Sequence, residues 1–437
     1  MALRVAMIGW EFPPFMSGGL ATHCFYLTRE LSKLGVEIDF FMPRTREPVS
    51  VSWMNVIQVD FSSFSEFGAA AVFGGESEFR EFGPYRDFCR KELKAVRLEK
   101  GVVSPSGVDE AMVSPAGLGF FEAVNKYNSL CAKLVALYHC RRKYDLVHCH
   151  DWITFRAGEA VALECGVPWV ATVHSTEYDR TGNLWPFEWI LGIERRGVRA
   201  ADLVLAVSNR TAEQLVERFG ADRRRLRVFY NAIDVAPFAN KAFRREDFGF
   251  PADSKIVLYN ARLSVQKGPE VFLRAAARVL EKEPRARFVV SGSGDLLPRL
   301  TELAVDLGIA GKVRFVGFTP FCDIPVLYAV SDVYVLPSVS EPFGITVLEA
   351  MASGTPVIVS KTSGVSEVVK NCLTVDFWDV DGIASRVLGV LKYAVLKQVL
   401  GEGGREEARG LSWDKTASDV KWFYGQAIAG LGGEVVG

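Results

Sequence analysis

The sequence predicts an α/β protein in which two doubly wound domains of similar size face each other across a cleft. The chain has 437 residues, which is too long for one ordinary domain. Short apolar runs alternate with helical patterns, as in parallel sheets that are covered by helices. The alternation occurs twice, on either side of residues 236–254, a polar stretch without a clear period. We therefore assign residues 1–240 to an N-terminal domain and residues 241–410 to a C-terminal domain.

The first half of the chain is expected to begin with a strand, a helix and a second strand. The expected strands are short and apolar, and they cover residues 4–8, 36–42, 146–149, 169–173 and 203–207. Residues 20–34 have a helical pattern that ends at Gly35. Residues 121–140 predict a packed helix because their apolar residues share one face: Phe121, Val124, Tyr127, Leu130, Leu134 and Leu137.

The second half repeats this alternation more regularly. Strands are expected at residues 256–260, 288–290, 313–316, 333–336, 357–359 and 373–375, with helices between them. A last helix is expected near residues 413–428. By analogy with similar folds, the segment that contains it, residues 411–437, packs back on the first domain.

Composition and charge exclude several classes of protein. The net charge of −1 provides no overall field that favours nucleic acid or an anionic membrane. No run of 18 apolar residues occurs, so we expect no membrane span, and the first residues do not have the layout of a signal peptide. Eight cysteines are scattered without a CxxC pair, which favours a reducing cytoplasm. The oligomeric state is left open.

His148-Cys149-His150 invites comparison with a metal site. Alternation along a strand would send both histidines to one face and the cysteine to the other. The spacing matches no zinc pattern, and we expect no metal here.

Residues 44–118 allow two interpretations. They carry phenylalanines among glycines and serines, at positions 61, 64, 67, 73, 79, 82 and 88. The segment is either an insertion whose aromatic side chains cover the core of the first domain, or a surface that binds an acceptor.

Polar residues that follow the predicted strands are the candidate site residues, because ligands of open α/β sheets bind beyond the carboxyl ends of the strands. Gly18 and Gly19 open a helix after the first strand, where backbone amides can approach an anion or a sugar. His174 follows a buried strand, a position that is as often structural as functional. Arg262 and Lys267 follow another strand and lead into a helix, which suits them to bind a diphosphate. Gly292 belongs to a glycine-rich turn after the next strand, which we expect to lie beside the nucleotide of the donor.

The stretch EPFGITVLEAM, residues 341–351, places Glu341 before a helix and Glu349 about two turns into it. Eight residues of helix span roughly 12 Å. The amides of Gly344, Ile345 and Thr346 lie between the two carboxylates and suit a phosphate. A nucleoside diphosphate sugar has the same order of groups, so Glu349 would hold the ribose and Glu341 the sugar. The alternative is an N-terminal acid and an ordinary surface glutamate.

Together these motifs resemble the retaining GT-B glycosyltransferases of family 4. The resemblance rests on GGLATH, HCHDW, TVHSTEYDRTG, AVSNRT, FYNAID, ARLSVQKG and EPFGITVLEAMASGTPVI, and it covers residues 1–43 and 140–425. It is strongest to the glycogen-synthase-like members, and it implies two Rossmann-like domains that face a cleft.

The resemblance also implies roles for residues. Gly18 and Gly19 would lie against the donor phosphates, and His174 against the 6-hydroxyl region of the donor sugar. His150 and Asp151 would lie near the sugar or the acceptor. Arg262 and Lys267 would neutralise the diphosphate, as their charge already suggests. Two departures are noted: no lysine precedes Ser17-Gly18-Gly19, and Asn231-Ala232-Ile233-Asp234 replaces the usual Asn-Gly-Ile-Asp.

The implied activity is transfer of a hexosyl group, glucosyl in the first instance, to a carbohydrate acceptor with retention of configuration. The donor would be a nucleotide sugar such as ADP-glucose or UDP-glucose, and neither a metal nor a cofactor is expected. One alternative is a mannosyl- or N-acetylhexosaminyl-transferase that acts on a lipid or a small molecule. Another is a non-catalytic protein that binds sugar nucleotides.

Overall fold

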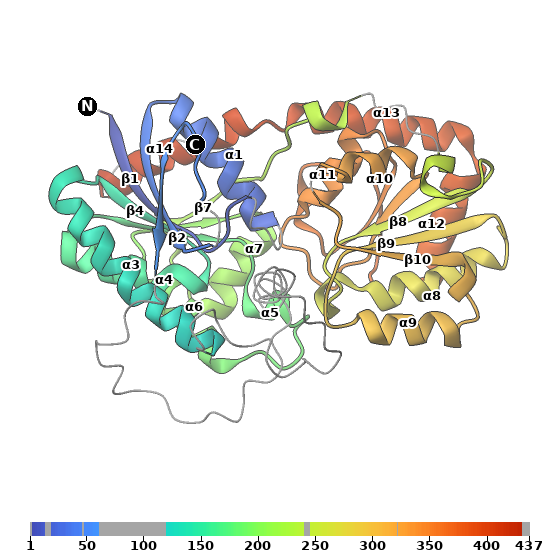
Figure 1. Cartoon of the computed structure of the whole chain (residues 1–437), viewed down its shortest axis with the longest axis horizontal. Helices are drawn as coiled ribbons and strands as arrows, with labels where there is room; N and C mark the ends of the chain where they lie inside the picture. The colour runs from blue at the N-terminus through green and yellow to red at the C-terminus, as the bar shows by residue number, and fades with distance from the viewer. Residues whose placement is uncertain are drawn as a thin grey trace.

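The computed structural model describes residues 2–13, 19–45, 48–60, 119–239, 245–320 and 322–430. It contains two parallel sheets, of seven and six strands, that lie side by side with helices on both faces (Figure 1). The prediction of two doubly wound α/β domains is therefore confirmed. Gly18, and residues 61–118 with their phenylalanines, lie outside the described residues.

The first sheet has the strand order β3-β2-β1-β4-β5-β6-β7. Its strands are β1 (Leu3–Ile8), β2 (Val36–Pro43), β3 (Asn55–Val59), β4 (Leu146–His150), β5 (Trp169–Val173), β6 (Leu203–Ala206) and β7 (Leu226–Val228). Its helices include α1 (Gly19–Lys33), α3 (Phe120–Arg142), α4 (Trp152–Cys165), α5 (Glu177–Arg180), α6 (Glu188–Ala200) and α7 (Asn209–Gln214). The sequence did not predict β3 and β7. Both are edge strands that are only partly buried, so they lack the long apolar run of a central strand.

The second sheet has the order β10-β9-β8-β11-β12-β13. Its strands are β8 (Lys255–Asn260), β9 (Ala286–Ser291), β10 (Val313–Gly317), β11 (Val333–Leu336), β12 (Val357–Ser360) and β13 (Leu373–Val375). Its helices include α8 (Pro269–Leu280), α9 (Leu297–Asp306), α10 (Ile324–Val330), α11 (Ile345–Ala352), α12 (Val380–Lys392) and α13 (Ala394–Gly410). All six strands lie where the sequence predicted them, within one to two residues at each end.

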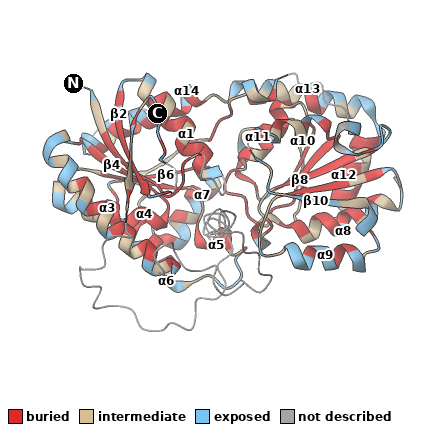
Figure 2. Cartoon of the chain, in the orientation of Figure 1, coloured by how far each residue is buried: buried red, intermediate tan, exposed pale blue. Residues whose placement is uncertain are grey.

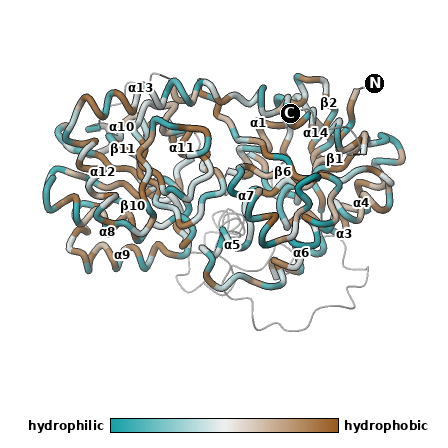
Figure 3. The backbone as a smooth tube through the Cα atoms, turned by 180° about the vertical axis from the view of Figure 1, so that it is seen from behind, coloured by the Kyte–Doolittle hydropathy of each residue, from teal (hydrophilic) through white to brown (hydrophobic). Residues whose placement is uncertain are grey.

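The central strands of both sheets are buried on both faces, as expected where helices cover a parallel sheet (Figure 2). Seen from behind, hydrophilic and hydrophobic residues alternate along surface helices such as α8 and α9 (Figure 3). This alternation is typical of helices that bury one side only.

The last helix, α14 (Trp413–Ile428), lies beside α1 of the first domain (Figure 1). Its Tyr424 hydroxyl is 2.7 Å from Nδ1 of His148 in the buried strand β4. Among the residues that the structure describes, no helix combines the length and the apolar character needed to cross a membrane.

Candidate active site

The two domains meet through segments that follow their strands. Ser340, which follows β11, donates a hydrogen bond of 2.6 Å from Oγ to Oδ1 of Asp179 in α5, which follows β5. A Cβ built on Gly19, at the start of α1, would lie 3.4 Å from Cδ1 of Ile345 at the start of α11. Because these contacts join opposite domains, they bring the strand ends that carry the predicted site residues together along one boundary.

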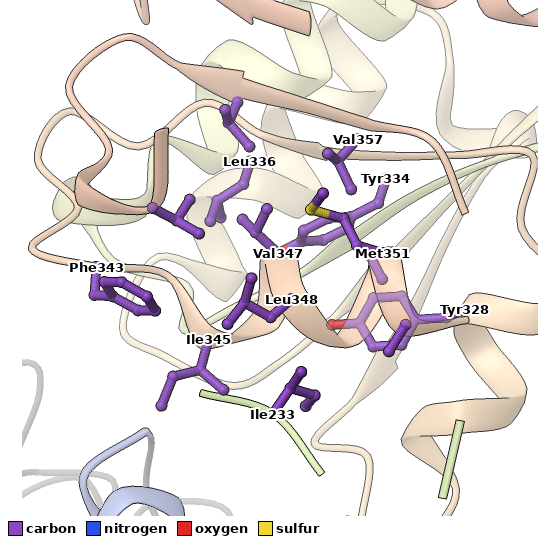
Figure 4. Close-up of a cluster of buried hydrophobic side chains, with 14 of the residues drawn as sticks. Ile233, Tyr328, Tyr334, Leu336, Phe343, Ile345, Val347, Leu348, Met351 and Val357 are labelled. Carbon is purple, nitrogen blue, oxygen red and sulfur yellow. The ribbon is translucent and has the colours of Figure 1, made fainter. Parts of the chain in front are cut away.

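Helix α11 begins at Ile345, one to two residues later than the sequence predicted, with Gly344 as its N-cap residue. Gly344 has a φ of 111°, a conformation that only glycine adopts easily. No side chain among the described residues caps this helix end, so its first amides remain available to a ligand. Val347, Leu348 and Met351 of this helix pack among buried side chains of the second domain and hold the helix in place (Figure 4).

Glu341 and Lys267 form an ion pair that the sequence did not predict. The Lys267 Nζ donates a hydrogen bond of 2.6 Å to Oε2 of Glu341, and the Ser338 hydroxyl donates a second one of 3.1 Å. Glu341 is only 5% exposed. The sequence placed these two residues on different parts of the donor, the sugar and the diphosphate. In the structure these two side chains are in direct contact.

Lys267 reaches this position because of a tight turn. It ends the 3₁₀-helix η5 (Val265–Lys267), and Gly268 follows with a φ of 64°. A Cβ at Gly268 would lie 2.1 Å from the carbonyl oxygen of Pro337, the residue after β11. A glycine is therefore needed for the loop that carries the lysine to approach the segment that carries Glu341.

Arg262 lies in the same loop and is half-buried. Within the described part of the chain, its guanidinium forms no ion pair or hydrogen bond, whereas Lys267 is paired. Gly292 packs against this loop, since a Cβ there would lie 1.9 Å from the carbonyl oxygen of Ala261. A glycine is needed at position 292 because two backbones approach each other closely there. The Arg262 guanidinium, in the neighbouring loop, is available to bind an anion.

Glu349 is buried inside the second domain, where its side chain is 5% exposed. Its Oε2 accepts a hydrogen bond of 3.1 Å from the Tyr328 hydroxyl, which in turn accepts one of 3.0 Å from Nδ2 of Asn260. Burial raises the pKa of Glu349 to about 7, and the hydrogen bond from Tyr328 partly opposes this rise. A ligand that donates further hydrogen bonds would stabilise the charged carboxylate.

On the opposite side, Asp151 connects the ends of β4 and β5. Its Oδ1 accepts hydrogen bonds from the backbone amides of His174, at 2.7 Å, and Ser175, at 3.4 Å. Asp151 has a positive φ of 60° and precedes α4. Burial raises its pKa to about 6, and the charge of Arg180 opposes the rise. The carboxylate therefore holds the backbone at the start of the loop that carries His174.

His150 and His174, which the sequence placed at the ends of two predicted strands, lie in contact with each other. Nδ1 of His150 is 3.0 Å from Nε2 of His174, and the two rings are stacked. His148 lies on the same side as His150, with ring centroids 4.3 Å apart, whereas Cys149 belongs to the core on the other side of the sheet.

His23 of α1 is a site residue that the sequence analysis missed. Its ring centroid lies 4.5 Å from that of His174, and its Nδ1 is 2.7 Å from Oδ1 of Asn231. The motif GGLATH ends at this histidine, about one helical turn after Gly19. A residue one turn into a helix whose start lies at the boundary with the second domain could have been identified from that spacing.

The histidine cluster is electrically neutral near neutral pH. Burial lowers the pKa of His23 to about 4 and that of His148 to about 3. Burial and the neighbouring histidines hold the pKa values of His150 and His174 well below the usual range. The cluster therefore offers uncharged hydrogen-bonding groups.

A buried ionic group supports the loop that follows His174. Arg180 donates to Oε2 of Glu177 at 3.1 Å, to Oε1 of Glu194, and to the carbonyl oxygen of Ser175 at 2.7 Å. Burial raises the pKa of Glu194 to about 8, and Arg180 opposes this rise. No sequence pattern pointed to this network, because Glu194 comes from a separate helix, α6.

Comparisons with known proteins agree with this arrangement. The model of the glycosyl transferases group 1 matches residues 240–407, and that of glycosyltransferase family 4 matches residues 90–237. An uncharacterized glycosyltransferase of Methanocaldococcus jannaschii is 30% identical, over 98% of this chain and 100% of the relative. A D-inositol 3-phosphate glycosyltransferase of Catenulispora acidiphila is 32% identical, over 98% and 96% of the two chains.

Solved structures share the fold. Sucrose-phosphate synthase from Thermosynechococcus elongatus superposes with a TM-score of 0.74 at 22% identity, over 98% of this chain and 99% of that one. The two family models cover strands β4 to β7 of the first sheet and the whole of the second sheet, and the Methanocaldococcus relative extends over nearly the whole chain. This chain therefore belongs to the GT-B glycosyltransferases, with a family 4 region followed by a group 1 region.

Proposed function

We propose that this glycosyltransferase moves a glucosyl group from a nucleoside diphosphate sugar to a carbohydrate acceptor and retains the configuration of the anomeric carbon. The observation that carries the proposal is the ion pair between Lys267 and Glu341 beside the uncapped start of α11. This pair puts a cation for the diphosphate and a carboxylate for the sugar within 2.6 Å of each other. The linkage that breaks in the reaction lies between those two parts of the donor.

The leaving diphosphate is stabilised mainly by positive charge. Arg262, Lys267 and the amides at the start of α11 are suited to the negative charge that grows on it. Glu349 is suited to the ribose, whose hydroxyl groups can donate to a buried carboxylate. This layout needs no divalent cation to neutralise the diphosphate.

The two carboxylates that we assign to the sugar side, Glu341 and Asp151, are engaged in other interactions, which supports attack from the same face rather than through a covalent intermediate. Glu341 is neutralised by Lys267 and hydrogen-bonded by Ser338. Asp151 accepts the backbone amide of His174. Neither is arranged as the unpaired nucleophile of a two-carboxylate mechanism. The acceptor proton would then pass to the leaving phosphate, and His174 would orient the donor sugar.

The carbohydrate acceptor and the donor base are tested together. Melting temperatures with ADP, UDP and GDP identify the base, because a ligand that binds the native state stabilises it by mass action. Transfer from the matching glucose donor is then measured with glycogen and with a maltooligosaccharide. Radiolabel incorporated into the glucan supports the proposal. Stabilisation by a nucleotide without transfer to any glucan contradicts the acceptor that we propose.

A second candidate is transfer to a small phosphorylated polyol. It is favoured by the name of the Catenulispora relative, a D-inositol 3-phosphate glycosyltransferase that is 32% identical. The same assay with inositol 3-phosphate as the acceptor separates the two candidates, because the product is then a small soluble glycoside rather than a longer glucan.

A further inference from the structure

We propose that His23, His150 and His174 form a binding site for a divalent transition-metal ion of the Zn²⁺ type. The three side chains come from α1, β4 and the loop after β5, and each offers one ring nitrogen. These ligand atoms all lie within 4.8 Å of one another. His174 is the residue that the proposed reaction assigns to the donor sugar, so the site adds a ligand to that region.

The spacing of the nitrogens is close to that of a tetrahedral site. Zinc holds imidazole nitrogens at about 2.0–2.1 Å, which places two of them about 3.3 Å apart. Nδ1 of His150 and Nε2 of His174 are already 3.0 Å apart. The His23 ring offers a nitrogen within 4.8 Å of the other two residues' ligand atoms, so a small movement of this ring would complete the set of three nitrogens.

Two ring nitrogens in the cluster lack a partner. Nε2 of His23 and Nε2 of His150 are buried and form no hydrogen bond with the described residues. Leaving such an atom unpaired costs about 1–3 kcal/mol. A bound metal ion would give the lone pair of the His23 Nε2 a partner. Nε2 of His150 stays outside the ligand set, because that ring binds through Nδ1.

Asn231 prepares His23 as a ligand. Its Oδ1 lies 2.7 Å from Nδ1 of His23 and can only accept a hydrogen bond. The proton is therefore held on Nδ1, and the lone pair of Nε2 is directed away from Asn231. A histidine ligand that donates its second N–H to an oxygen is the usual arrangement around protein-bound zinc.

Access also suits a cation. His23 and His150 are buried whereas His174 is only half-buried, so an ion can enter beside His174, with water as its fourth ligand.

A metal ion at this site withholds His174 from the donor sugar, so the ion and the donor exclude each other. This consequence rests on the proposed transferase function, whereas metal binding itself does not. Zinc is therefore expected to inhibit an enzyme that needs no metal for turnover.

Metal binding is tested by titrating Co²⁺ into the full-length, chelator-treated protein and recording its visible spectrum. We expect intense bands of four-coordinate cobalt that saturate at one equivalent and disappear when Zn²⁺ is added. Replacing His23 with asparagine should weaken binding by at least about 100-fold, because removing a ligand costs more than removing an outer partner. His139→Asn, the same change on α3, should bind as the wild type does. Absence of cobalt bands in the wild type would overturn the site.

His23 is buried, so a second variant guards against loss of folding. Asn231→Leu keeps all three imidazoles and removes only the oxygen that fixes the tautomer of His23, and it should weaken Co²⁺ binding by about 10- to 100-fold. Unchanged binding in both variants, each with a normal melting curve, would refute the assignment of ligands.

Adding the glucose donor that supports transfer should abolish the cobalt bands, and persistence of the bands would overturn mutual exclusion. Metal uptake by a protein that transfers no sugar would refute the proposed function and support the metal site. Transfer by a protein that takes up no metal would support the proposed function and refute the metal site.

Discussion

Replacing Glu341 with alanine should separate donor binding from turnover. The change removes the acceptor of the 2.6 Å hydrogen bond from Lys267. A hydrogen bond between charged groups contributes about 1.5–3 kcal/mol, equivalent to roughly 10- to 150-fold in an equilibrium constant. The released ammonium can turn to the diphosphate instead. A free nucleoside diphosphate should therefore bind the variant at least as tightly as the wild type, and up to that factor more tightly.

Turnover should fall in the same variant. The donor sugar loses a carboxylate that orients it, and a misplacement of about 1 Å can reduce the rate by about 100-fold. Calorimetry with the nucleoside diphosphate and steady-state kinetics with the full donor measure the two effects separately. Glu341→Gln is the control, because it keeps an oxygen acceptor for Lys267 and removes the charge. Loss of nucleoside diphosphate binding in Glu341→Ala, with binding retained in Glu349→Ala, would show that the two glutamates are assigned in the wrong order.

Other predictions concern Glu349, the metal requirement and the phenylalanine-rich segment. Glu349→Ala should raise the donor KM roughly 10- to 150-fold with little change in kcat, because a ribose contact exists in the ground and transition states alike; a change in kcat alone would contradict this. Because burial raises the pKa of Glu349 from 4.5 to about 7, the native state binds this proton more tightly, and stability is lost as the pH rises through that interval. Glu349→Gln should therefore stabilise the ligand-free protein by up to about 3 kcal/mol at about pH 8 and by much less at about pH 5. Equal shifts of the melting temperature at the two pH values would contradict this prediction. Transfer should persist in excess chelator, and a loss that Mg²⁺ restores would contradict the role of Arg262 and Lys267. A Gly-Ser linker in place of residues 61–82 should reduce transfer and leave nucleotide affinity intact, and an equal loss of both in a folded protein would exclude an acceptor role.

The fold was predictable where burial alone determines the sequence pattern. Strands β8 to β13 are apolar runs between helices, and each was placed within one to two residues. The edge strands β3 and β7 escaped prediction because one side of an edge strand can carry polar residues. Helix α11 begins one to two residues after the predicted position, because Gly344 has a positive φ of 111° and is not helical.

The candidate site was predictable one residue at a time but not as a set of contacts. Motif spacing identified Glu341 and Lys267, but 74 positions separate them, and no local rule shows that they touch. The same holds for His23 and Asn231, which are 208 positions apart. Contacts of this kind depend on how segments that are far apart in the sequence pack against one another. Only the tertiary structure shows that packing.

The most direct test of the proposed function is the anomeric configuration of the first product. Proton NMR can follow the reaction of a nucleoside diphosphate α-glucose donor with a maltooligosaccharide in the presence of chelator. We predict a new α-linked glucosyl residue, formed in equal amounts with the free nucleoside diphosphate. A β-linked product, or release of the nucleoside diphosphate with no new glycosidic bond, would contradict it.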